Sequence, residues 1–167
     1  MIIMKKILGL LGLLMLSCIL TSCTKEDPTK QELYQYMSKD VVSISEQHNK
    51  AISKYNEYME NAEGDAEALL EALDGDIMVD LKQTIINLDN LVYQYHPAID
   101  LREKYKNAVE KELEAMQAIY DAVKAEDDEA LVSANILVAE AQRELDVYHT
   151  AVKIKAAEYG ISLIENE

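Results

Sequence analysis

The chain contains no tryptophan and no phenylalanine, so any hydrophobic core must use tyrosine as its aromatic residue. All ten aromatic residues among the 167 are tyrosines. The length is enough for one ordinary domain with a real core. A buried tyrosine needs a partner for its hydroxyl group, or must let that group reach the edge of the core. Tyr55, Tyr105, Tyr120 and Tyr148 fall on the apolar seams and are expected to lie mostly in the core, with their hydroxyls reaching the edge of the bundle.

Cysteine is nearly absent, and its position matters more than its number. The two cysteines, Cys18 and Cys23, both lie in or at the edge of the apolar segment that opens the chain. From residue 24 onward there is no thiol at all. This part of the chain therefore has no disulfide, no thiol nucleophile and no cysteine metal site.

Basic residues are also few. Lys5 and Lys6 are the only charged residues in the first 23, so the rest of the chain carries 14 basic against 31 acidic residues. Nucleic acid and anionic membrane faces both attract cationic surfaces. The sequence therefore predicts no nucleic-acid partner.

The N-terminal segment has the three parts of a secretory signal peptide, over residues 1–22. Two lysines are followed by an apolar run from Ile7 to Leu20, and then by the small residues Thr21 and Ser22. The run is short for a membrane-spanning helix, which needs about 20 apolar residues. An uncleaved membrane anchor is the alternative interpretation.

The end of this segment, Leu20-Thr21-Ser22-Cys23, resembles the bacterial lipoprotein signal, in which a small residue precedes the cysteine. The resemblance implies cleavage between Ser22 and Cys23 and acylation of Cys23 on its sulfur and its amine. Cys18 is a poorer match and belongs to the apolar run. Two or three acyl chains would hold the protein permanently on a membrane.

Lys25, Glu26 and Asp27 follow the cysteine and look like the short surface-export signal of Bacteroidota lipoproteins. That resemblance implies an outer-membrane protein exposed at the cell surface. The alternatives are a solvated tether with no sorting role, on a lipoprotein that faces the periplasm or sits on a Gram-positive membrane. Residues 23–28 are predicted to be the lipidated cysteine and a short tether, and 29–167 the folded domain.

Glycine and proline are scarce after Cys23, and they separate segments of about 30 residues. The full set is Pro28, Gly64, Gly75, Pro97 and Gly160. Between these positions, apolar residues recur every three or four positions, as on one face of a helix. The pattern predicts helices over 29–62, from an N-cap at Asp65 to His96, from Pro97 to the turn at 126–128, and from there to Gly160.

Four helices of similar length with short connections favour an all-α fold. We expect an antiparallel up-down four-helix bundle with coiled-coil-like apolar seams. Asp74-Gly75-Asp76 interrupts the second helix and predicts a kink or local break there. The alternative arrangement is one long helix kinked at Pro97, with a more extended shape.

The three histidines are candidate metal ligands. A di-iron bundle needs Glu-x-x-His on two helices, and here the nearest match is the single Asp146–His149 pair. His48 lies in the seam of the first helix, where it is expected to be a core histidine hydrogen-bonded across the bundle. Asp74, Asp76 and Asp80 lack the spacing of a calcium loop. We predict no metal and no cofactor.

No nucleophile is grouped with a base and an orienting residue, so no catalytic residue is predicted and an enzyme is not expected. Paired glutamates such as Glu110, Glu112 and Glu114 are assigned to solvated helix faces. Tyr34 and Tyr36 lie on opposite sides of the first helix, so at least one should be exposed and available for protein contacts. Tyr93 and Tyr95 are expected to be split in the same way, at the opposite end of the bundle.

The helical domain is similar to small all-helical bacterial lipoproteins of unknown function. The residues that carry this resemblance are Tyr55-Asn56-Glu57-Tyr58, Ala134-Asn135 and Ala156-Ala157-Glu158-Tyr159-Gly160-Ile161. It implies a bundle and no activity. The expected function is a lipid-anchored, non-enzymatic binding or envelope-interaction module. It would be held by its N-terminal lipid and would have an unidentified protein partner. The alternative is a bundle that holds a small molecule or metal near His48 or Gly75.

Overall fold

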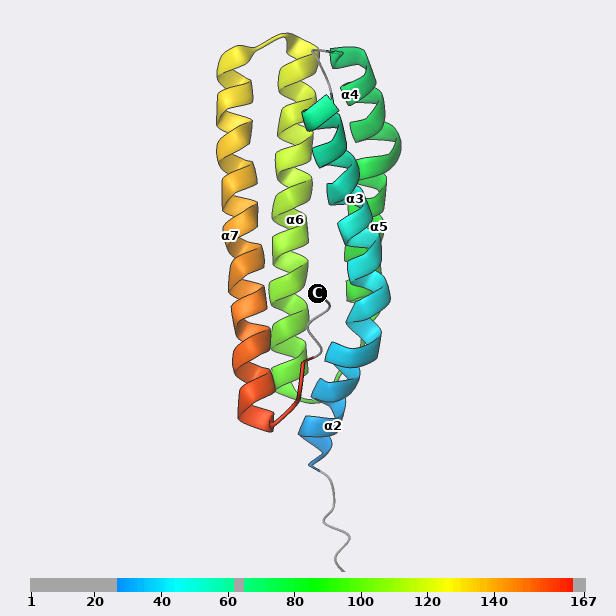
Figure 1. Cartoon of the computed structure of the whole chain (residues 1–167), viewed down its shortest axis with the longest axis vertical. Helices are drawn as coiled ribbons and strands as arrows, with labels where there is room; N and C mark the ends of the chain where they lie inside the picture. Colours follow the sequence, from blue (N-terminus) through cyan, green and yellow to red (C-terminus); the bar gives the residue numbers. More distant parts are fainter. Residues whose placement is uncertain (1–26, 62–64, 164–167) are drawn as a thin grey trace, which may run out of the picture.

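The computed structural model describes residues 27–61 and 65–163, and within these ranges it contains helices and no strand. The described chain has four helical segments, as the sequence predicts, over 28–61, 66–89, 96–125 and 128–159 (Figure 1). The predicted signal peptide, its cleavage site at Ser22 and Cys23, and the residues Lys25 and Glu26 lie outside the described residues. The α-helices are α2 (Pro28–Gln35), α3 (Val41–Asn61), α4 (Ala66–Ala72), α5 (Met78–Asp89), α6 (His96–Ala125) and α7 (Asp128–Tyr159).

The first helix begins at Pro28, one residue earlier than predicted, so Pro28 belongs to the fold and not to the tether. The Asp27 side chain accepts a hydrogen bond from the Thr29 backbone nitrogen at 2.9 Å and caps α2. Pro28 occupies the first turn, where its missing N–H breaks no helical bond. Lys30 ties this helix to the end of α7, because its Nζ donates to the Gly160 carbonyl oxygen at 3.3 Å.

Three further predicted helix boundaries, at Asp65, at the 126–128 turn and at Gly160, are confirmed. Asp65 caps α4 by accepting from the Ala68 nitrogen at 3.1 Å, and Asp127 caps α7 by accepting from the Ala130 nitrogen at 2.9 Å. Gly160 ends α7 with a φ of 59°, a backbone conformation that glycine adopts without strain. Short polar side chains and one glycine therefore define these boundaries, as their types predict.

The end of the second segment differs from the prediction. Helix α5 stops at Asp89, and the chain from 90 to 95 is a non-helical connection to α6, so the expected helix up to His96 is wrong. Val92 is 87% exposed and does not continue the apolar stripe. The connection also shows that α5 and α6 are separate helices and not one helix kinked at Pro97.

Side chains from two other elements hold this connection. Both carboxylate oxygens of Glu32 on α2 accept backbone hydrogen bonds, from the nitrogens of Gln94 and Tyr95, each at 2.8 Å. Arg102 on α6 donates from Nη1 to the Leu91 carbonyl oxygen at 2.6 Å. These bonds satisfy backbone groups that a longer helix would have paired within itself.

Two π-helical turns interrupt the helices. Leu73–Ile77 joins α4 to α5 around Gly75, which confirms the predicted local irregularity. A second π-helical turn, Tyr36–Asp40, joins α2 to α3 and was not predicted, since it contains neither glycine nor proline. A π turn takes an extra residue, so it changes which side chains face inward.

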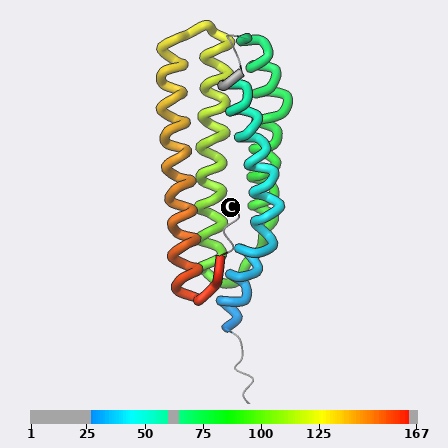
Figure 2. The backbone as a smooth tube through the Cα atoms, viewed as in Figure 1, coloured from blue at the N-terminus to red at the C-terminus, as the bar shows by residue number. Residues whose placement is uncertain are grey.

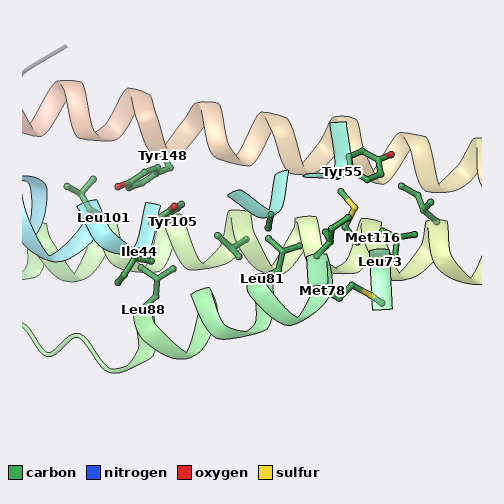
Figure 3. Packing of buried hydrophobic residues seen from close by; sticks show 14 of the residues in the cluster. Ile44, Tyr55, Leu73, Met78, Leu81, Leu88, Leu101, Tyr105, Met116 and Tyr148 are labelled. Carbon is green, nitrogen blue, oxygen red and sulfur yellow. The ribbon is translucent and has the colours of Figure 1, made fainter. Parts of the chain in front are cut away.

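The helical segments lie side by side along the long axis of the molecule, and α2 begins at the end where α7 finishes (Figures 1 and 2). Helix α7 packs mainly on α6, and α3 mainly on α5, whereas α3 and α7 have far less contact than either of these pairs. Leucine, isoleucine, alanine and tyrosine side chains fill the centre (Figure 3). Helix α6 carries buried alanines seven residues apart, at Ala108, Ala115 and Ala122.

Candidate functional site

Three polar side chains are buried among the described residues: His48, Thr84 and Glu112. Thr84 has a local explanation, because its hydroxyl donates to the Asp80 carbonyl oxygen one turn earlier, at 2.8 Å. His48 and Glu112 are different, since they come from two helices and are 2% and 6% exposed. Burying ionisable groups is costly unless they are paired. This pair is therefore the candidate site.

His48 on α3 faces Glu112 on α6, with its Nε2 against the Glu112 Oε2 atom. The other ring nitrogen, Nδ1, lies 2.9 Å from the hydroxyl oxygen of Tyr105, which is one heptad before Glu112 on α6. The prediction of a core histidine bonded across the bundle is confirmed. The assignment of Glu112 to a solvated face is wrong, because it lies on the inner stripe with Tyr105, Val109 and Met116.

Both ring nitrogens of His48 have a polar partner. With one proton on the ring, Nε2–H donates to the Glu112 carboxylate and the Tyr105 hydroxyl donates to Nδ1. With two protons, the ring donates to Glu112 and to the Tyr105 oxygen. In either form the imidazole joins a carboxylate and a phenol from two turns of the same helix, α6.

A row of tyrosines continues from this pair through the interior. The rings of Tyr105 and Tyr148 are stacked, with centroids 4.6 Å apart and planes 9° apart, and they lie next to each other in Figure 3. Tyr36 donates from its hydroxyl to the Tyr148 hydroxyl oxygen at 3.1 Å. Tyr93 lies edge-on to Tyr36, with centroids 5.7 Å apart, and donates to the Asp40 carboxylate at 2.9 Å.

Burial keeps these phenols protonated. It raises the pKa of Tyr148 to about 12. The pKa values of Tyr36, Tyr93 and Tyr105 are also raised, in each case mainly by loss of hydration, and nearby phenols or carboxylates add to the effect. The row therefore contains hydrogen-bonding hydroxyls and no charge at neutral pH.

The predicted tyrosine positions are partly confirmed. Tyr34 is 52% exposed while Tyr36 is fully buried, so they face opposite sides of α2 and the turn after it, as expected. The expectation for Tyr93 and Tyr95 is wrong in two respects. Both are half-buried, and they lie at the same end as Tyr36, because the connection that carries them packs beside α2.

A small pocket opens beside the buried pair, between α3, α6 and α7. Its volume is about 110 Å³. Buried Glu112 belongs to its inner wall, and the exposed side chains of Asn56 and Gln142 stand at its mouth. It is lined by Ile52, Tyr55 and Asn56 from α3, Glu112, Ala115 and Met116 from α6, and Val138, Ala141 and Gln142 from α7. Glu112 thus connects the buried hydrogen bonds to a space open to a ligand.

The other candidate site residues from the sequence do not come together in one place. His96 and His149 are exposed, and Asp76 is in an ion pair with Lys54 at 2.7 Å. Within 27–61 and 65–163, no three His, Cys, Asp or Glu side chains are grouped closely enough to hold a metal ion. Asp27 caps α2, as described above, whereas Cys23, Lys25 and Glu26 lie outside the described residues.

Comparisons with family models, curated proteins and solved structures gave no match to this chain. No helix in the described part of the chain combines the length and the apolar character that a membrane crossing requires.

Proposed function

We propose that the protein is a lipid-anchored, extracytoplasmic lipoprotein whose helical domain is a non-enzymatic binding or envelope-interaction module. Cys23 would carry the acyl chains after cleavage behind Ser22, and Lys25, Glu26 and Asp27 would direct the protein through the outer membrane to the cell surface. The four helical segments would form an antiparallel up-down bundle with coiled-coil-like seams. The partner would be an envelope or surface protein.

The N-terminal sequence supports the lipid anchor, and the start of α2 shows how near to the folded domain the anchor would be. Helix α2 begins at Pro28, only five residues after Cys23. Even a fully extended tether of that length reaches only about 18 Å. A lipid on Cys23 would therefore keep α2, and the end of the domain that contains it, next to the membrane.

The outer face of α7 supports a binding role, and it is the observation on which the proposal of a protein partner rests. Large apolar side chains on this face are more than half exposed, although the helix is fully packed on its other side against α6. Such side chains on a helix surface are typical of protein contacts. They are Val132, Ile136, Val147 and Ile154.

Protease treatment of intact host cells tests the location. The wild-type protein should be cut, and a variant with Lys25→Ala and Glu26→Ala should be protected if those residues direct export. Asp27→Asn tests the third residue of the motif separately, because asparagine also caps helices and so removes the charge while α2 stays intact. Cys23→Ala should abolish lipid labelling. A wild-type protein that resists protease while other surface proteins are cut would contradict surface exposure.

Cross-linking in the same cells tests the partner. Ile136→Glu together with Val147→Glu places two charges on the α7 face and should reduce the cross-linked product about tenfold or more. Val79→Glu together with Ile86→Glu is the matched control, because these α5 side chains are equally exposed at 51% each. Equal cross-linking by both double variants would exclude α7 as the contact face.

A second candidate function is a lipoprotein that binds a small molecule. The pocket of about 110 Å³ beside Glu112 favours it. The alternative with a metal ion has less support, because His48 and Glu112 would be its only ligands of the usual types at this place.

A further inference from the structure

We propose that the pocket between α3 and α7 binds a small primary amine in its ammonium form, with the Glu112 carboxylate as counter-ion. The inference deepens the second candidate function and rests on it. It depends on the burial of the Glu112 carboxylate, on the groups around the pocket and on the size of the space.

No strongly basic side chain lies beside the buried carboxylate. Glu112 is 6% exposed, and within the described chain no lysine or arginine nitrogen lies within 4.0 Å of its carboxylate. Its partner there is the His48 ring. A primary amine has a pKa close to that of lysine, about 10.4, and is therefore a full cation at neutral pH. A carboxylate in the interior is stabilised by a cation beside it, so an ammonium group in the pocket would be a counter-ion for Glu112.

The groups at the pocket suit the three N–H donors of an ammonium group. Among the described contacts, His48 is bonded to Glu112 through Oε2 only, which leaves lone pairs of the carboxylate for a second donor. Gln142 donates from Nε2 to the Asp146 carboxylate at 3.4 Å, so its amide oxygen is available as an acceptor. Asn56 supplies a second amide at the mouth.

The walls and the size select a short alkyl chain. Ile52, Met116 and Val138 are apolar, and the ring of Tyr55 adds an aromatic surface that also attracts cations. A space of about 110 Å³ is large enough for a few methylene groups and too small for the usual drug-sized ligand. A divalent metal would need more carboxylate or imidazole ligands than this place offers.

Calorimetric titration of the full chain, purified in detergent, tests the assignment with butylamine as the probe. Butylamine at neutral pH should bind about tenfold more tightly than 1-butanol, which has the same chain and no charge. Glu112→Gln should remove this preference. Glu114→Gln is the matched control, because Glu114 is an exposed carboxylate on the same helix, and it should change the affinity less than about twofold.

Val138→Phe is a second variant that leaves the buried pair intact and fills the pocket. It should abolish binding of both probes, so the proposal stays testable if Glu112→Gln fails to fold. Equal affinity for butylamine and 1-butanol would overturn the ammonium assignment and keep a small-molecule site. If neither probe binds, the small-molecule site is excluded as well. That result would not affect the proposals of a lipid anchor and of a protein partner on α7. An equal loss of affinity in Glu114→Gln would assign the preference to the overall negative charge of the protein.

Discussion

Replacing His48 with leucine should lower the free energy of unfolding by about 3–5 kcal/mol. The change leaves the Glu112 carboxylate buried without its hydrogen-bond donor, and the Tyr105 hydroxyl without its acceptor. Both groups are largely removed from bulk water, at 6% and 2% exposed, so leaving either without its hydrogen-bond partner is costly. Urea unfolding followed by circular dichroism measures the loss. A change of this size would remove a large part of the stability of an ordinary domain.

His149→Leu is the matched control, because His149 is exposed on α7, and it should change stability by no more than about 0.5 kcal/mol. The double variant His48→Leu, Glu112→Leu should recover most of the loss, since it removes the unpaired charge along with its partner. Similar losses in His48→Leu and His149→Leu would contradict the buried pair. A double variant less stable than His48→Leu alone would show that the unpaired carboxylate is not the cause.

Alkaline pH should destabilise the protein through its buried tyrosines. An unfolded tyrosine loses its proton near pH 10, whereas burial raises the pKa of Tyr148 to about 12 in the folded protein. Above pH 10 the unfolded state therefore holds fewer protons, and stability falls as the pH rises through 12. Tyr148 alone accounts for about 3 kcal/mol of that fall. Tyr36 and Tyr105, whose pKa values are also raised, act in the same direction.

Urea unfolding at a series of pH values, with tyrosinate absorbance recorded at each, checks this dependence. Tyr148→Phe removes one buried phenol, so its stability should fall less steeply between pH 10 and 12 than that of the wild type. Tyr34→Phe is the matched control, because it removes the hydroxyl of a half-exposed tyrosine and leaves every buried hydroxyl in place. A free energy of unfolding that stays constant from pH 9 to 12 would show that burial does not raise the pKa values of these tyrosines.

The helices and most of their ends could be predicted because their causes are local. Asp65, Asp127 and Gly160 define boundaries through their own side chains or backbone freedom. The heptad position of His48 was likewise enough to place it in the core. The expectation that seam tyrosines reach the edge of the bundle with their hydroxyls is wrong for Tyr105 and Tyr148, whose hydroxyls bond to His48 and Tyr36 inside the core.

The remaining features depend on contacts between distant parts of the chain. Glu112 was assigned to solvent because glutamates are usually exposed, although its position one heptad after Tyr105 pointed inward. The connection after Asp89 is irregular because Glu32 and Arg102 hold its backbone, and no local pattern contains that information. The π turn at Tyr36–Asp40 carries no glycine or proline to mark it.

The attachments of α2 decide where a mechanical load would enter the molecule. If the protein is tethered through Cys23 as proposed, any pull on it against the membrane reaches Pro28 first and then passes along α2. The helix transmits that force to the connection at 94–95 through the two hydrogen bonds of Glu32, and to the end of α7 through Lys30. Fully buried Leu33 and Tyr36 anchor the same short stretch. Tension would therefore spread over two distant segments of the chain at once, and α2 could not peel away from its end without breaking bonds to both.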